Sequence, residues 1–259
     1  MAQEVHRVAM EQTMGEYLDD IDTHAADTTN EGRKNLWAAN IGLMAYLKNM
    51  CDVKPGIIYE EFQKVGDIDG NLQGINIVTS EDKKLRVYCW DTWTSKKVHR
   101  FNSLVQYRVG DAIERVTWAD IAEKPGKMGN VQDCYSEINT VYDKDNRPIY
   151  LVMSFSINEG HEGAHEIQAF AIDSVLAPVA VFNFYGELKT TLKVSKDKAI
   201  RGNWSEDDTN IKISPDGRSI YVPVVRSANV KAPVSKDEKR YHVYQFNGRE
   251  FVYKENLNN

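Results

Sequence analysis

The chain has 259 residues and a formal net charge of -6, with 42% hydrophobic and 27% charged residues. These proportions are ordinary for a globular protein and exclude collagen-like, low-complexity and wholly disordered chains. The excess of acidic side chains argues against a nucleic-acid binder and against an anionic membrane surface as the partner. No segment approaches the roughly 18 consecutive apolar residues that a membrane-spanning helix requires.

The first 65 residues differ from the rest and predict a helical region. Apolar side chains recur at helical spacing, which indicates helices over about 3–21 and 30–51. Thr28, Thr29 and Asn30 are candidate N-caps of the second helix, and Pro55-Gly56 ends it. We expect these helices to form a hairpin with one further short turn near residues 57–63, as a domain over residues 1–65.

From residue 66 onward the sequence predicts short β-strands. β-Branched and aromatic residues gather in runs at intervals of roughly ten residues, separated by turn residues. The clearest hairpin turn is Asn247-Gly248, and Pro215-Asp216-Gly217 is the next. The expected strands are 75–78, 85–90, 104–109, 113–118, 135–142, 149–157, 165–173, 178–185, 211–213, 219–226, 241–246 and 250–254.

The two regions together predict an α+β protein that is mainly antiparallel β. No helix long enough for a parallel crossover separates the strands, so residues 66–259 are expected to form an antiparallel meander. A sandwich, a barrel and an open, propeller-like array all fit this pattern. Ser214-Pro215-Asp216-Gly217 is typical of propeller turns, but the sequence shows no clear repeat of ~40–45 residues.

One segment resembles a known family. Arg86-Val87-Tyr88-Cys89-Trp90-Asp91-Thr92, which follows a serine–acid turn, is similar to a strand motif of uncharacterised bacterial secreted or lipoprotein-like proteins. Val105-Gln106-Tyr107, Tyr135-Ser136-Glu137-Ile138 and the tail from Tyr244 to Phe251 also resemble that family. The resemblance covers about residues 70–254 and implies an extracytoplasmic β-rich domain with no assigned activity.

The predicted location follows from this resemblance and from the N-terminus. Ala2-Gln3-Glu4 is a plausible mature end after removal of a signal peptide. We therefore expect a periplasmic or secreted protein, with the cytoplasm as the alternative. The three cysteines, Cys51, Cys89 and Cys134, are expected to be buried thiols, or one disulfide and one free thiol.

The same strand motif supplies a candidate ligand site. Arg86, Trp90, Asp91 and Trp93 combine charge with large rings, which stack on sugars or on peptide side chains. Trp90 and Trp93 are three residues apart, so on one regular strand they face opposite sides and one of them is a core residue. For Arg86 the structural alternative is a solvated side chain that covers apolar surface.

A second candidate is the histidine pair of His161-Glu162-Gly163-Ala164-His165. This order matches the H-E-x-x-H motif of zinc proteases, which places both histidines on one helix face. Gly160 and Gly163 disfavour a helix and strands flank the motif, so a hairpin is the expected structure. A surface metal site using His161, His165 and either Glu159 or His99 is the alternative.

Two acidic segments resemble calcium loops only in part. Asp67-Ile68-Asp69-Gly70-Asn71 has Leu72 and Val78 where an EF-hand needs glycine and glutamate. In Asp143-Lys144-Asp145, Arg147 takes a ligand position. Both segments are therefore predicted to be turns.

These observations favour a non-enzymatic binding protein that recognises a protein or a glycan through loops and aromatic residues. The first alternative is a hydrolase of glycan or peptide that uses loop-borne acids or a histidine metal site. The second is an assembly subunit in which the helical hairpin packs between copies of the chain. No cofactor, nucleic acid or integral membrane segment is predicted.

Overall fold

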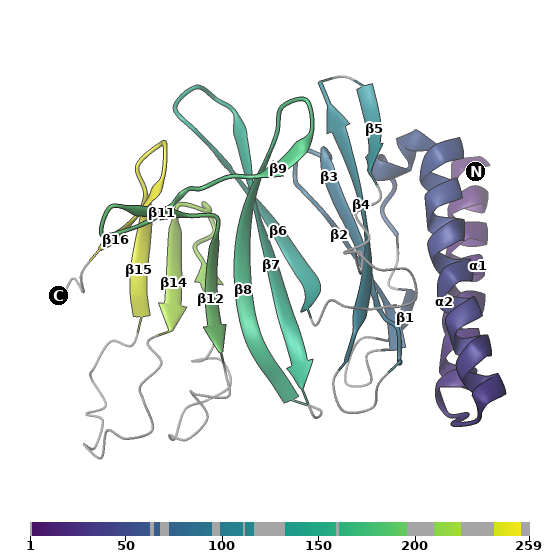
Figure 1. The fold of residues 1–259 in the computed structure, drawn as a ribbon. Helices are drawn as coiled ribbons and strands as arrows, with labels where there is room; N and C mark the ends of the chain where they lie inside the picture. The colour runs from purple at the N-terminus through teal and green to yellow at the C-terminus, as the bar shows by residue number, and fades with distance from the viewer. Residues whose placement is uncertain are drawn as a thin grey trace, which may run out of the picture. The chain divides into compact units, whose positions relative to one another are not determined.

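The fold is taken from a computed structural model (Figure 1). The structure describes residues 2–62, 65–67, 73–94, 99–110, 112–116, 133–158, 161–195, 210–223 and 241–254. These residues form two compact units. The first unit contains residues 1–136 and 157–161, and the second contains residues 137–156 and 162–259. The sequence-based boundary at residues 65 and 66 lies inside the first unit.

The first unit begins with the two expected helices, α1 (Ala2–Ala25) and α2 (Asn30–Val53). Thr29 caps α2, since its hydroxyl accepts a hydrogen bond of 3.0 Å from the backbone N–H of Gly32. Pro55 opens the short 3₁₀ helix η1 (Pro55–Tyr59) that follows. α1 continues beyond its predicted end at residue 21, because Ile21 is buried among core residues and outweighs the nearby acids.

The first sheet has five antiparallel strands in the order β1-β2-β3-β4-β5. Side chains of its strands alternate between two faces. Tyr88, Trp90 and Leu104 belong to one apolar core with α1, α2 and η1. β3 is buried along its whole length, so its opposite face is buried too. The strands are β1 (Val65–Asp67), β2 (Gln73–Thr79), β3 (Leu85–Asp91), β4 (Phe101–Val109) and β5 (Ala112–Val116).

The second unit is built from two further sheets. One has the order β12-β8-β7-β6, with β9 beside β8, and the other has the order β11-β10-β16-β15-β14-β13. Their apolar side chains form one core that includes Leu151, Ile167, Phe182, Ile220 and Phe251. The strands are β6 (Asp133–Tyr142), β7 (Pro148–Asn158), β8 (His161–Ile172), β9 (Leu176–Pro178), β10 (Phe182–Phe184), β11 (Glu187–Lys189), β12 (Thr191–Ser195), β13 (Lys212–Ile213), β14 (Ser219–Pro223), β15 (Tyr241–Phe246) and β16 (Phe251–Lys254).

The predicted fold class is confirmed: the protein is α+β, with a helical hairpin before mostly antiparallel strands. Two pairings depart from a pure meander, because β10 runs parallel to β16 and because β12 pairs with the non-consecutive strand β8. None of the sheets formed by the described strands closes into a barrel. Among the described residues, no helix combines the length and the apolar character needed to cross a membrane.

Candidate functional site

The residues of the strand motif are mostly interior. Trp90 is 1% exposed and Arg86 is 2% exposed, so neither offers a surface to a ligand in this structure. The indole Nε1–H of Trp90 donates a 3.0 Å hydrogen bond to Asn40 Oδ1 of α2. Asn40 in turn donates to the backbone oxygens of Leu36 and Thr92. Trp90 therefore fastens the helical hairpin to β3.

The Arg86 side chain is buried, and its hydrogen bonds run to neutral oxygens. Its guanidinium donates to the backbone oxygens of Ile57 and Glu60 and to the hydroxyl of Thr79. The ring of Phe62 lies 5.3 Å from the guanidinium carbon. Arg86 therefore holds η1 and the segment after it against the sheet, and this role replaces the expected covering of apolar surface.

Asp91 is the last residue of β3, Trp93 lies in the loop after it, and His99 joins them. Asp91 is 3% exposed, and its carboxylate contacts His99 Nδ1 and accepts a 2.9 Å hydrogen bond from the Trp93 N–H. Burial raises the pKa of Asp91, against the lowering effect of these bonds. Trp93 has a φ of 54° and stacks edge-on against His99 at 5.4 Å. The strand motif thus ends in a buried Asp–His pair with a tryptophan beside it.

The histidine pair lies on a strand. Positions 161 and 165 both belong to β8, so the helix that the zinc motif needs is absent there. Four residues of strand span about 13 Å, which is too far for one metal ion. His165 is buried and lies 6.3 Å from the ring of Phe155. Among the described residues, no group of three or more His, Cys, Asp or Glu side chains could hold a metal ion.

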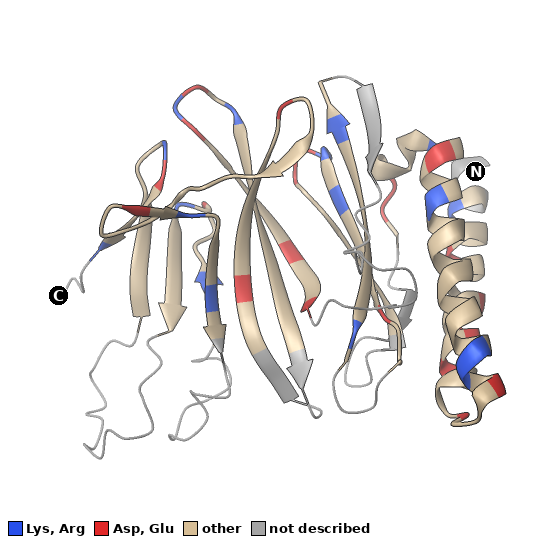
Figure 2. Cartoon of the chain, viewed as in Figure 1, with Lys and Arg blue, Asp and Glu red and all other residues tan. Residues whose placement is uncertain are grey.

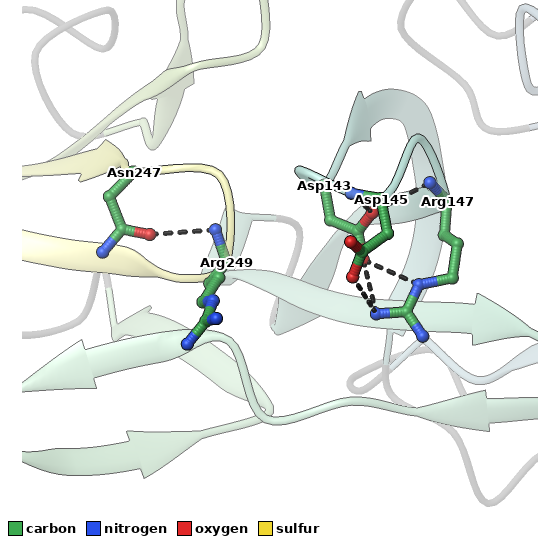
Figure 3. Close-up of polar contacts among 5 residues, drawn as sticks. All are labelled: Asp143, Asp145, Arg147, Asn247 and Arg249. Carbon is green, nitrogen blue, oxygen red and sulfur yellow. Dashed lines mark hydrogen bonds and ion pairs between the residues drawn. The ribbon is translucent and has the colours of Figure 1, made fainter.

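The acidic segment at Asp143 is the turn that the sequence predicted (Figure 3). The Arg147 guanidinium binds both carboxylates. Its Nε donates a 2.9 Å hydrogen bond to Asp143 Oδ2, and its Nη2 donates one of 3.4 Å to Asp145 Oδ2. Hydrogen bonds from the backbone and side chain of Arg147 lower the pKa of Asp143. The guanidinium therefore stands where a cation would bind. The other acidic segment, 67–71, lies mostly outside the described residues.

Charged side chains lie on the helices and in the turns, while most strand positions carry neither sign (Figure 2). Two of these turns meet in the second unit, since the Lys144 N–H donates a 2.8 Å hydrogen bond to the Gly248 oxygen. Figure 3 shows Arg249 on the neighbouring turn, where Asn247 accepts from its backbone N–H. These bonds involve the backbone of both turns and order the turns themselves.

The sequence reasoning missed a group of rings in the second unit, in which an exposed tyrosine lies beside three half-buried rings. We call Phe184, Tyr185, His242 and Tyr253 the Tyr185 cluster. Tyr185 is 69% exposed, and its ring lies 4.7 Å from Phe184 and 5.3 Å from Tyr253. The Tyr253 hydroxyl is 3.0 Å from His242 Nδ1. Burial lowers the pKa of His242, which favours its neutral form.

The members of this cluster come from three short strands and one turn. β10 pairs with both β11 and β16, and β16 pairs with β15, so the chain segments near 184, 242 and 253 become neighbours. Lys189 of β11 places its ammonium 5.8 Å from the Phe184 ring and 3.4 Å from Glu187. The only signal in the sequence was the aromatic content of 178–185 and 241–254, which did not reveal the β10–β16 pairing.

Comparisons with known proteins do not add to this picture. No family model matches the chain, and no curated protein matches it either. The resemblance to secreted bacterial proteins therefore stays a prediction. The assembly interpretation also stays a prediction, although α2 exposes Trp37 and Ile41 one helical turn apart.

Proposed function

We propose that this is a non-enzymatic binding protein, acting outside the cytoplasm, that recognises a glycan through the Tyr185 cluster. The alternative is that the protein recognises another protein, and this alternative is one outcome of the test below. The extracytoplasmic location is supported by the sequence resemblance, and fractionation of cells that express the protein tests it.

The observation that carries the proposal is the backbone at Tyr185. Tyr185 and Gly186 are the two loop residues between paired Phe184 and Glu187, and their φ values are 51° and 92°. Positive φ at both positions is the requirement of a type I′ turn, for which Asn-Gly is the favoured pair. A tyrosine is a poor choice there for folding, and strained residues cluster at functional sites. We therefore infer that the exposed ring of Tyr185 serves binding rather than folding.

The chemistry around Tyr185 suits a sugar. Apolar ring faces accept the C–H face of a pyranose, while nearby polar groups bind its hydroxyls. The Lys189–Glu187 ion pair and the Tyr253 hydroxyl supply donors and acceptors beside the rings. The Tyr185 cluster contains only a few rings among polar groups. It therefore suits a small amphipathic ligand better than a protein partner, because a standard protein interface covers about 800 Å² on each partner.

The test compares Tyr185→Asn with Tyr142→Asn. Tyr142 is an exposed tyrosine at the end of β6, outside the cluster, and serves as the matched control. Glycans bound by the wild type on an array would be measured by calorimetry with each variant. We expect Tyr185→Asn to weaken binding by about tenfold or more, which corresponds to about 1.4 kcal/mol.

Stability separates a binding role from a folding role. Because Tyr185→Asn creates an Asn-Gly turn, we expect its melting temperature to equal or exceed that of the wild type. Equal glycan affinity in Tyr185→Asn and wild type would overturn the proposal. An array without any bound glycan would also overturn it and would leave a protein partner as the remaining interpretation.

A further inference from the structure

Two of the three cysteines meet in the interior of the first unit. Cys89 lies in the middle of β3 and is 1% exposed, and Cys134 lies near the start of β6 and is 5% exposed. Both belong to the same compact unit. In the structure all three cysteines are thiols that form no disulfide.

The hydrogen bonds around Tyr135 locate the two thiols relative to each other. Cys89 is directly opposite Asn76 in the β2–β3 pairing, so both side chains stand on the same face of the sheet. Asn76 Nδ2 donates to the backbone oxygen of Tyr135, and Cys134 Sγ lies 3.8 Å from that same oxygen. The start of β6 is thereby held over the position where Cys89 emerges from β3.

The two thiols also influence each other's ionisation. Burial opposes ionisation of Cys89, but hydrogen bonds with Cys134 and Ser103 lower its pKa. The hydrogen bond with Cys89, together with burial, raises the pKa of Cys134. The Cys134 thiol therefore favours Cys89 as the thiolate, which is the reactive form in disulfide chemistry.

We propose that Cys89 and Cys134 form an intramolecular disulfide when the chain folds in the presence of a disulfide oxidant such as oxidised glutathione. The Cys89 thiolate attacks one glutathione sulfur and releases the other half as a reduced thiolate. Cys134 then loses its proton and attacks the Cys89 sulfur of this mixed disulfide, which releases the second reduced glutathione. Two electrons pass from the cysteine sulfurs to the oxidant, and the thiol protons go to solvent.

Access decides when this reaction occurs. Glutathione cannot reach a side chain that is 1% exposed in the folded unit, so the bond forms during folding or during an opening of the sheet. Cys51 is buried in the core that the helices share with the first sheet, a set to which neither Cys89 nor Cys134 belongs. It is therefore expected to stay a thiol. The inference does not depend on glycan binding, so either proposal can be refuted without affecting the other.

The experiment is oxidative refolding of the unmodified full chain in a glutathione redox buffer. Free thiols are counted in denaturant, and peptides are mapped without reduction. We expect one remaining thiol, at Cys51, and one linked peptide pair containing Cys89 and Cys134. Three remaining thiols in refolded protein, or any linkage that includes Cys51, would overturn the inference.

Variants sharpen this result. Cys51→Ala should lose both of its thiols and the mass of two hydrogen atoms. Cys51→Ala combined with Cys134→Ser, the matched control, should keep its single thiol under the same conditions. If a variant fails to refold, the peptide map of the unmodified chain still decides the question, because it needs no substitution.

Discussion

Asn40 offers the sharpest test of how the helical hairpin is attached to the first sheet. It is a fully buried amide within the apolar stripe of α2, and its side chain makes three hydrogen bonds. Replacing it with leucine keeps the size of the side chain but leaves the Trp90 N–H and the Thr92 oxygen without this partner. Each orphaned buried group costs about 1–3 kcal/mol. We therefore expect Asn40→Leu to lower the free energy of unfolding by about 2–4 kcal/mol.

The assay is urea denaturation followed by circular dichroism, with Asn49→Leu as the control. Asn49 is exposed on the same helix, so its replacement should change stability by no more than about 0.5 kcal/mol. A double-mutant cycle with Trp90→Phe isolates the bond between the two side chains. The double variant should lose about 1–2 kcal/mol less than the sum of the single losses.

Two results would refute this reasoning. If Asn40→Leu matched Asn49→Leu, the three hydrogen bonds would contribute nothing net, and the amide would be replaceable by any side chain of its size. If the cycle were additive, Asn40 and Trp90 would act independently. The hydrogen bond between these two side chains would then contribute nothing to the attachment of α2 to β3.

Two further predictions concern a turn and a histidine of the second unit. Gly217 has a φ of 70°, and a Cβ there would lie 2.7 Å from Val141 Cγ1, so Gly217→Ala should cost about 1–3 kcal/mol in urea denaturation. Gly15→Ala, in α1 with no atom within 4 Å of the new carbon, should instead stabilise by about 0.5–1 kcal/mol; equal effects would refute the account. His242 has a lowered pKa in the folded protein, so stability should be complete above its unfolded value of 6.5 and should decline as pH falls through the folded value. His242→Gln should remove this decline in urea midpoints compared across that range, and an unchanged decline would assign it to other groups.

The sequence predicted the order and the type of elements well. Helical spacing located both helices, because tertiary packing and the Thr29 cap agree with local preference. Alternation and turn residues located most strands, and Asn247-Gly248 does join β15 to β16. Pairings between distant segments were beyond reach, since neither the parallel β10–β16 contact nor the approach of Cys134 to Cys89 leaves a local pattern.

The candidate site shows the same limit at the level of single residues. Arg86, Trp90 and Asp91 looked functional because charge and large rings alternate on one strand. Their burial on both faces of the sheet depends on what covers β3, which no spacing rule reveals. Tyr185 looked unremarkable because its exposure and its positive φ both follow from a two-residue loop that the sequence reasoning had placed inside a strand.

One recurrence became visible only through hydrogen bonds. The turns that begin at Ser80, Asp143 and Ser214 share a scheme in which the first side chain accepts a later backbone N–H. In each turn the fourth residue has a positive φ: Lys83 at 56°, Asn146 at 58° and Gly217 at 70°. Their sequences are Ser-Glu-Asp-Lys-Lys, Asp-Lys-Asp-Asn-Arg and Ser-Pro-Asp-Gly-Arg.

Each of these turns joins two antiparallel strands: β2 to β3, β6 to β7, and β13 to β14. A search for whole repeats of blade length overlooks them, because only the loop recurs while the flanking strands differ. The pattern that recurs is an acceptor side chain, an aspartate two residues later, a left-handed residue and then a base. Turns of this one kind occur in all three sheets, while the strands that flank them differ. The feature that recurs in this β region is therefore the turn and not the strand.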